Sequence, residues 1–93
     1  MIYVDQPIHS WRNKKWCHLI ADDLQELHGF AAKLGLKREW FQNHRIQPHY
    51  DITVSKREQA IKLGAISIET KQMAERVESI LKKRRNANAA LQS

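Results

Sequence analysis

Residues 49 to 51, within the stretch QPHYDITVSKRE, place an imidazole, a phenol and a carboxylate at the start of a predicted β-strand. In a strand, His49 and Asp51 point to one face and Tyr50 to the other. A histidine and an aspartate at this spacing can share a divalent metal ion, or can form an acid–base pair in which the carboxylate fixes the histidine tautomer. The alternative is structural: Pro48 ends a loop, His49 is exposed and Asp51 caps a nearby turn.

Three further titratable side chains are candidates to join this pair. His18 falls in a predicted strand and His28 lies on the apolar face of a predicted helix, so each is either a hydrogen-bonded core residue or a ligand. Asp5 ends the first predicted strand, a position that suits a metal ligand or a turn residue. If a divalent metal ion is a cofactor, the predicted ligands are Asp5, His49 and Asp51.

The charge balance favours an anionic partner. The chain carries 16 Lys and Arg residues against 10 Asp and Glu residues, a formal net charge of +6, which suits a nucleotide, nucleic acid or an acidic protein face. With three glycines and no glycine-rich loop, phosphate is expected to be held by side chains and helix N-termini. Arg38 and Arg57 are candidates for this role. Trp40 or Tyr50 would stack a base, or are core residues instead.

A second basic feature is the run KKRR at residues 82–85, which supplies four of the 16 basic residues. It is either a solvated basic tail or a surface that binds phosphate groups. In the second case it would contact nucleic acid or a host protein.

Length and composition exclude several protein classes. The 93 residues form one domain, and no apolar run approaches the roughly 20 residues of a membrane helix. The first residues lack the pattern of a secretory signal, and the single cysteine, Cys17, excludes an internal disulfide bond and a thiolate zinc site. We therefore expect a cytoplasmic protein with no membrane partner, for which a homo-oligomer stays open.

Hydrophobic periodicity and capping residues predict the elements that position these side chains. Asp22 and Gln25 form a capping box at the start of the first helix, and Ser55 and Glu58 form another at the start of the second. Thr70 caps the third helix. The predicted strands span 2–4, 16–21, 50–54 and 65–68, the helices span 22–34, 56–63 and 70–81, a short helix or turn spans 37–42, and a loop spans 5–15.

Strands that alternate with helices indicate an α/β fold. We predict a small single-layer sheet of about four strands, partly parallel, packed by three main helices. The domain spans residues 1–85, and residues 86–93 form a frayed C-terminal tail. The predicted buried stripe of the third helix consists of Met73, Val77, Ile80 and Leu81.

Long, ordered motifs span about residues 1–70. They are an initial strand ending in Asp, W-x-H-L-x-x-D, E-L-H-x-F-A, a basic and aromatic turn, H-Y-D, and R…A…G-A. The positions that carry them are Asp5, Trp16, His18, Leu19, Asp22, Glu26, Leu27, His28, Phe30, Ala31, Arg38, His49, Tyr50, Asp51, Arg57, Gly64 and Ala65. In these motifs the chain resembles the short bacterial and phage proteins grouped as domain of unknown function 4031. The residues after position 81 depart from that pattern.

The resemblance implies no activity, but some bacterial members look like companions of phosphohydrolase domains, which points to nucleotides. It also marks polar positions that packing alone does not require. We expect these positions to converge on one pocket at the strand ends. The predicted ligand-binding residues are His18, His28, Arg38, Trp40, His49, Tyr50, Asp51 and Arg57.

Three functions are compatible with these features. The leading hypothesis is a small cytosolic module that binds a phosphorylated, nucleotide-like ligand; in a phage, such a module would sequester a host defence signal. The first alternative is a metal-dependent phosphodiesterase or nuclease that uses Asp5, His18, His49 and Asp51. The second alternative is a basic inhibitor that binds a host protein or nucleic acid through its tail.

Overall fold

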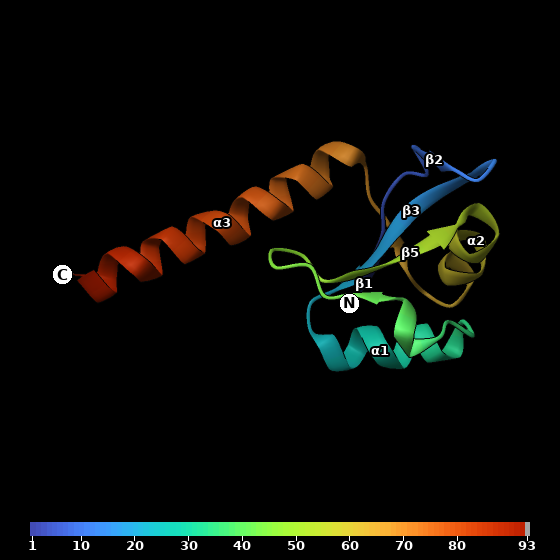
Figure 1. The fold of residues 1–93 in the computed structure, drawn as a ribbon, viewed down its shortest axis with the longest axis horizontal. Coiled ribbons are helices and arrows are strands. Elements are labelled where there is room, and N and C mark those ends of the chain that lie inside the picture. The colour runs from blue at the N-terminus through green and yellow to red at the C-terminus, as the bar shows by residue number, and fades with distance from the viewer. Residues whose placement is uncertain (93) are drawn as a thin grey trace.

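A six-stranded mixed sheet forms the centre of the computed structural model, which describes the backbone of residues 1–92 and the side chains of residues 1–86. Two helices pack on the sheet and a third extends away from it (Figure 1). The elements in chain order are β1 (Ile2–Val4), β2 (His9–Trp11), β3 (Lys14–Ala21), α1 (Leu24–Lys33), the 3-10 helix η1 (Arg38–Trp40), β4 (Phe41–Gln42), β5 (His49–Thr53), α2 (Val54–Lys62), β6 (Ile66–Ser67) and α3 (Thr70–Gln92).

Strand β3 connects the whole sheet. It pairs antiparallel with β1, where Val4 lies opposite Leu19, and with β5, where His18 lies opposite Asp51. Strand β1 pairs in parallel with β6, and β5 pairs antiparallel with β4. The strand order is therefore β4-β5-β3-β1-β6, with β2 also paired to β3. The predicted α/β class with a partly parallel sheet is confirmed, and β2 and β4 add to the four predicted strands.

The alternation of side chains gives the sheet an apolar face and a second face, called the polar face here, that carries polar side chains beside the buried Ile20. Cys17, Leu19 and Ile52 point to the apolar face and are at most 1% exposed, because buried residues of α1 and α2 cover them. His18 and Asp51 point to the opposite face and stay partly accessible. Burial of the apolar side chains, at roughly 25 cal/mol per Å², thereby determines which polar side chains face outward.

Residues 5–15 form part of a hairpin, so the predicted loop is wrong over β2. Strand β2 pairs antiparallel with β3, where His9 lies opposite Trp16. The two-residue turn between them has Arg12 at φ 50° and Asn13 at φ 61°. This left-handed geometry matches the twist of a tight hairpin. Because glycine is absent from the turn, the usual sequence signal of such a hairpin is missing.

The cap of α1 lies one residue after its predicted position, and the cap of α2 lies two residues before its predicted position. Asp23, rather than Asp22, caps α1 and accepts a hydrogen bond from the backbone N–H of Glu26 at 2.8 Å. Thr53, rather than Ser55, caps α2. Asp22 instead pairs with Arg76 of α3 at 3.1 Å. Neighbouring residues of capping type made both positions plausible, and only the backbone geometry selects one.

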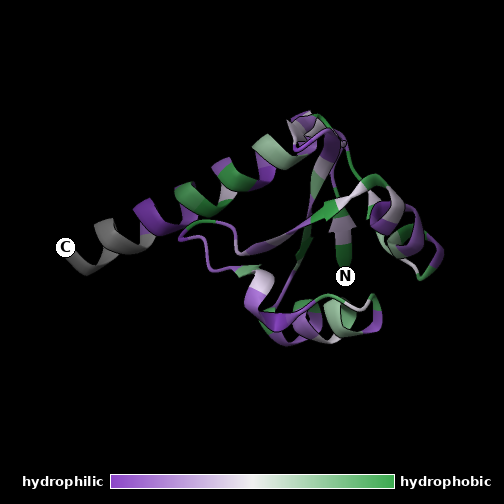
Figure 2. Ribbon diagram, turned by 45° about the vertical axis from the view of Figure 1, so that its right-hand side comes forward, coloured by the Kyte–Doolittle hydropathy of each residue, from purple (hydrophilic) through white to green (hydrophobic). Residues whose placement is uncertain are grey.

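Helix α3 is less buried than predicted. Met73, Val77 and Ile80 are half-buried and Leu81 is exposed, because α3 leaves the sheet and extends away from it (Figure 1). Hydrophobic and hydrophilic segments alternate along this helix (Figure 2). The predicted buried stripe is therefore wrong at Leu81, and its other three positions are only half-buried.

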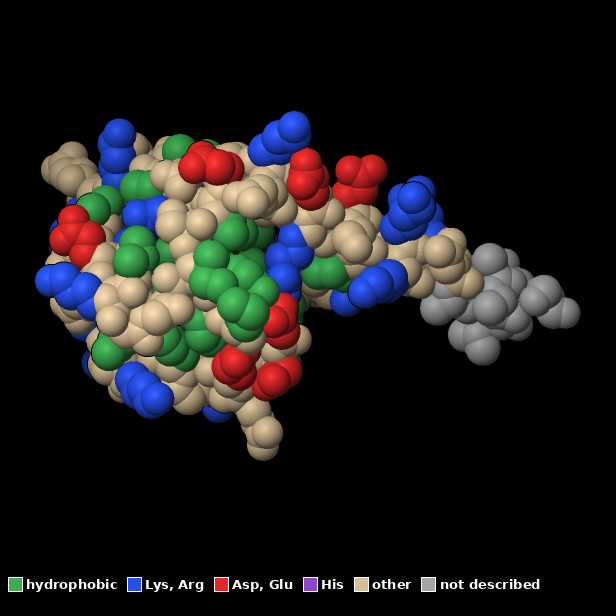
Figure 3. Space-filling view, turned by 180° about the vertical axis from the view of Figure 1, so that it is seen from behind, with side chains coloured by type: hydrophobic (Ala, Val, Ile, Leu, Met, Phe, Trp, Pro, Cys, Tyr) green, Lys and Arg blue, Asp and Glu red, His purple; other side chains and the backbone are tan. Residues whose placement is uncertain are grey.

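The basic run at residues 82–85 lies on α3 and is exposed. Lysine and arginine side chains project from this helix in Figure 3, and Arg84 donates a hydrogen bond to the carbonyl of Arg45 at 2.6 Å. The backbone of α3 continues to Gln92, while the side chains of residues 87–93 lie outside the described part. Fraying of residues 86–93 and both roles of the basic run stay predictions. Within the described part, no helix combines the length and apolarity that a bilayer crossing requires.

The cap of α1 can be tested by substitution. Asp23→Ala should lower the free energy of unfolding by about 1 kcal/mol, because it removes the acceptor of the Glu26 N–H group. Asp23→Asn keeps a capping oxygen and should lose much less. Urea denaturation of both variants measures the difference, and equal losses would contradict the assigned cap.

Candidate metal centre

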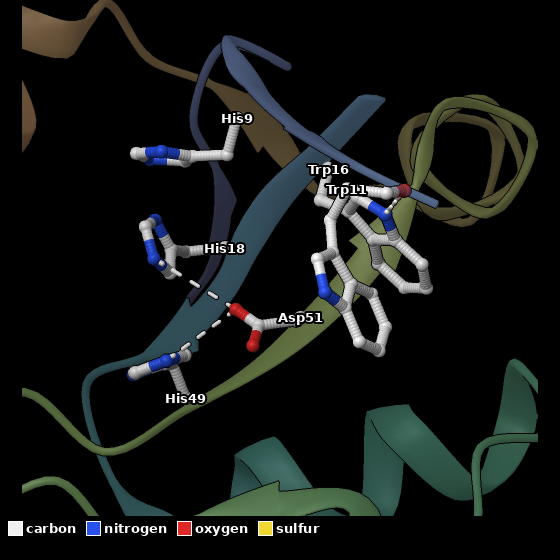
Figure 4. Close-up of a pocket in the computed structure, with 6 residues that line it drawn as sticks. All are labelled: His9, Trp11, Trp16, His18, His49 and Asp51. Atoms are coloured by element: carbon white, nitrogen blue, oxygen red, sulfur yellow. Dashed lines mark hydrogen bonds and ion pairs between the residues drawn. The ribbon is translucent and has the colours of Figure 1, made fainter. Parts of the chain in front are cut away.

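Two imidazoles and one carboxylate meet on the polar face of the sheet. His18 lies on β3, and His49 and Asp51 lie on the neighbouring strand β5. The Oδ1 atom of Asp51 is 3.5 Å from Nε2 of His49 and 3.8 Å from Nε2 of His18 (Figure 4). One ligand atom from each of the three residues lies within 4.8 Å of the other two. The strand register therefore assembles the cluster from His18 on one strand and from His49 and Asp51 on the next.

Asp5 orients His18 from behind. This carboxylate is 4% exposed, and its Oδ1 atom accepts the backbone N–H of His18 at 2.6 Å. Its Oδ2 atom lies 2.7 Å from Nδ1 of the His18 ring. Because an ionised carboxylate only accepts hydrogen bonds, Nδ1 carries the proton and the Nε2 lone pair faces Asp51. A carboxylate behind a histidine is the usual partner of a metal-ligating imidazole.

The ring of His49 has the same tautomer for a different reason. Its Nδ1 atom lies 2.9 Å from the backbone carbonyl of Gln47. Since a carbonyl can only accept, Nδ1 donates and Nε2 is left with its lone pair directed towards Asp51. In the neutral form of each ring, Nε2 is thus the nitrogen left free to bind a metal ion.

The spacing of the three ligand atoms fits a transition metal ion. Bonds of about 2.0–2.2 Å in tetrahedral geometry place ligand atoms roughly 3.4 Å apart, close to the two measured separations from Asp51. Imidazole nitrogen suits zinc, copper, iron and nickel. Three protein ligands leave at least one position for water or substrate, as in catalytic sites. His18, His49 and Asp51 can therefore hold such an ion with an open coordination position.

The charges around His18 favour its protonated form. The hydrogen bond to Asp5 raises the pKa of His18, against the opposing effect of burial, and the charge of Asp51 acts in the same direction as Asp5. A metal ion would therefore compete with a proton for Nε2 of His18. Burial raises the pKa of Cys17 to about 12, and this thiol lies on the apolar face. Cys17 is thus a core residue and not a reactive thiolate at neutral pH.

The cluster opens into a cavity of about 320 Å³ that two tryptophans also line. His9 of β2 stands beside His18, with ring centroids 5.1 Å apart, and Trp11 and Trp16 lie on the other side of Asp51 (Figure 4). His9 lies within the predicted loop at residues 5–15, so its position beside His18 was not predicted from the sequence. The feature of the sequence that could have indicated this hairpin is a short turn at Arg12 and Asn13 between two strand-like segments.

Two of the predicted ligand-binding residues lie on the opposite side of the sheet. Tyr50 is 1% exposed, and its hydroxyl group is 2.9 Å from Nδ1 of His28. Burial raises the pKa of Tyr50 and lowers that of His28, and the charge of Arg38 lowers both values. The Arg38 guanidinium lies 5.8 Å from the ring centroid of Phe41, which packs against His28. These residues form a separate cluster between α1, η1 and β4.

The remaining predicted residues also occupy different places. Arg57 donates to the carbonyl of Asp5 at 2.8 Å and to Ser67 Oγ at 2.6 Å, so it links β1 to β6. Trp40 lines a second cavity, described below. Asp5, predicted as a metal ligand, instead has both oxygens engaged by His18. The expectation of one shared pocket is therefore wrong. The structure brings together His18, His49 and Asp51, and Trp40 lines the second cavity with Asp51. The other predicted residues lie elsewhere, and their roles in binding stay predictions.

Comparison with known proteins agrees with the sequence motifs. The profile of the family described as "Protein of unknown function (DUF4031)" matches residues 2–80. The chain belongs to this family. No curated protein and no solved structure matches the chain. The candidate metal centre of this DUF4031 protein lies wholly within the matched region, whereas the basic run at residues 82–85 lies beyond it.

The influence of Asp5 on His18 predicts a pH effect. The folded-state pKa of His18 lies above its ordinary value of 6.5, so the pair contributes its full stability below that value and loses it as pH rises through the raised pKa. Asp5→Asn should lower the pKa of His18 and flatten this pH dependence. NMR titration of the histidine ring in chelator-treated protein measures the pKa. An unchanged value in Asp5→Asn would contradict the proposed pairing.

Proposed function

We propose that the protein is a metal-dependent hydrolase of a phosphorylated, nucleotide-like substrate, with the metal ion held by His18, His49 and Asp51. The observation that carries this proposal is that both imidazoles direct Nε2 towards Asp51 Oδ1 while Nδ1 is held elsewhere. This function combines two of the hypotheses drawn from the sequence. The protein would first bind a phosphorylated, nucleotide-like ligand, as in the leading hypothesis, and would then hydrolyse its phosphodiester bond, as in the first alternative.

The charge next to the cluster supports an anionic substrate. The net charge is +6. Arg12, in the turn between β2 and β3, lies over the ring of Trp11, which lines the cavity, and Lys14 of β3 lies opposite Trp11 in the strand pairing. Positive charge beside the cavity raises the local concentration of a phosphate group and speeds its association. The combination of two imidazoles with a single carboxylate leaves a bound divalent ion with net positive charge, which also favours an anion.

The chemistry divides between the ion and the chain. A divalent ion held by His18, His49 and Asp51 would activate a water molecule as nucleophile and neutralise charge on the phosphate. The chain supplies the geometry: Asp5 holds His18 in one tautomer and raises its pKa, and the Gln47 carbonyl holds His49 in the same tautomer. The supports lie on or beside paired strands, which hold a site more accurately than loops do.

Metal binding is the first test. Wild-type protein should bind Zn²⁺ or Mn²⁺ at one equivalent, and His49→Ala should weaken binding on the order of 100-fold or more, since it removes a ligand. Asp5→Asn should weaken it about 10- to 100-fold, because Asp5 acts through His18. Isothermal titration calorimetry and metal analysis measure both effects. His28→Gln, which changes a histidine on the other side of the sheet, serves as the matched control and should bind as wild type.

Turnover is the second test. With the bound metal ion, the protein should hydrolyse a phosphodiester such as bis(p-nitrophenyl) phosphate, and chelation should abolish the activity. Asp51→Asn should lose activity while His28→Gln keeps it. Metal binding without turnover on phosphodiesters and phosphomonoesters would refute hydrolysis and leave ligand binding. Failure of wild-type protein to bind any divalent ion would refute the metal centre itself.

A further inference from the structure

A second and larger cavity, of about 530 Å³, adjoins the metal centre. Trp11, Trp16 and Asp51 line both cavities, and Trp40 also lines the second one. We propose that this second cavity is a subsite for the planar ring of a nucleobase whose phosphate lies at the metal centre. The inference deepens the proposed function and rests on it for the position of the phosphate.

The aromatic walls are the first observation that supports a planar ring. Trp11 is 59% exposed and Trp40 is 46% exposed, although such large apolar surfaces are normally withdrawn from water. The two rings lie on different elements, β2 and η1, yet they line one cavity. Base–aromatic stacking would remove this apolar surface from water and accepts any base, because every base has a π-face.

One of the three tryptophan side chains, that of Trp16, is held in place by a hydrogen bond. Trp16 donates its indole N–H to the carbonyl of Trp11 at 3.0 Å, and the two rings meet edge to face with centroids 5.9 Å apart. A hydrogen bond from a side chain to the opposing strand fixes the wall of the cavity before any ligand arrives. Such preorganisation reduces the entropy cost of binding.

Positive charge surrounds the aromatic groups. The Arg12 guanidinium lies 4.4 Å from the Trp11 ring centroid, and Lys37 Nζ lies 5.6 Å from that of Trp40. Lys56 lines the cavity directly. Cations stacked on tryptophan are characteristic of surfaces that bind nucleic acid components. They complement a ligand that carries both an aromatic ring and a phosphate group.

The position of Asp51 relates the two ends of the ligand. In Figure 4, Asp51 lies between the histidines and the tryptophans, so a molecule that contacts the metal centre reaches the aromatic cavity directly. Glu39, Gln42 and Thr53 add hydrogen-bonding groups at the rim, which suit the polar edges of a base. The volume of about 530 Å³ lies within the range of small-molecule sites. The ligand class is thus a nucleotide, free or at the end of a strand.

The test compares ligands that share a phosphate but differ in the ring. Metal-loaded protein is titrated by calorimetry with adenosine 5′-monophosphate and with ribose 5-phosphate. The nucleotide should bind roughly tenfold more tightly or better, which corresponds to the stacking of one base. Trp11→Ala and Trp40→Ala should each reduce this preference while leaving the affinity for ribose 5-phosphate unchanged. Leu63→Ala changes a similarly exposed apolar residue outside the cavity and should keep the preference.

Two further arms separate this inference from the proposed function and identify the source of the base. Adenosine, which has no phosphate, should bind wild type and His49→Ala equally, because the ring subsite does not need the metal ion. A short oligonucleotide that binds more tightly than the mononucleotide, with the same loss in Trp11→Ala, identifies a strand end as the ligand; weaker binding identifies a free nucleotide. Equal affinity for nucleotide and ribose 5-phosphate, or an equal effect of Trp11→Ala on both, would overturn the subsite even if the metal centre is correct.

Discussion

The register between β3 and β5 is the constraint on which the candidate site depends. His18 lies opposite Asp51, and His49 lies two residues away on the same face. Because side chains alternate along a strand, a slip of β5 by one residue would turn both His49 and Asp51 towards the core, and a slip of β3 would turn His18 towards it. Burial of Cys17 and Ile52 under the helices prevents that slip. The apolar face of the sheet therefore sets the geometry of the polar face.

On the polar face, a series of contacts positions each side chain through the one before it. Arg57 of α2 holds the backbone of Asp5, Asp5 holds the ring of His18, and His18 faces Asp51. Arg57 also contacts Ser67 of β6, so the parallel edge of the sheet is tied to the same network. In a small domain the core contributes a narrow margin of stability. A buried carboxylate is costly unless it is fully hydrogen-bonded, and Asp5 meets that condition through His18.

Much of the architecture could be predicted from the sequence. The α/β class follows from the alternation of strands and helices, and the shared face of His49 and Asp51 follows from their spacing. The hairpin that carries His9 and Trp11 was missed because its turn lacks glycine and has Arg12 and Asn13 in the left-handed region instead. The caps of α1 and α2 differ from the predicted ones because several neighbouring residues have side chains that can cap a helix. Local patterns thus predict the type of an element better than its ends.

The sequence by itself determined the residue types, the alternation along β3 and β5, and the pair formed by His49 and Asp51. Tertiary structure alone decided which distant residues complete that pair, because strand pairing joins residue 18 to residue 51 and has no local signature. It also separated Tyr50 and His28 from the candidate metal ligands, because adjacent positions on one strand face opposite sides of the sheet. Finally, it placed the Asp5 carboxylate against Nδ1 of His18, because the pairing of β1 with β3 brings residues 13 positions apart into hydrogen-bonding contact.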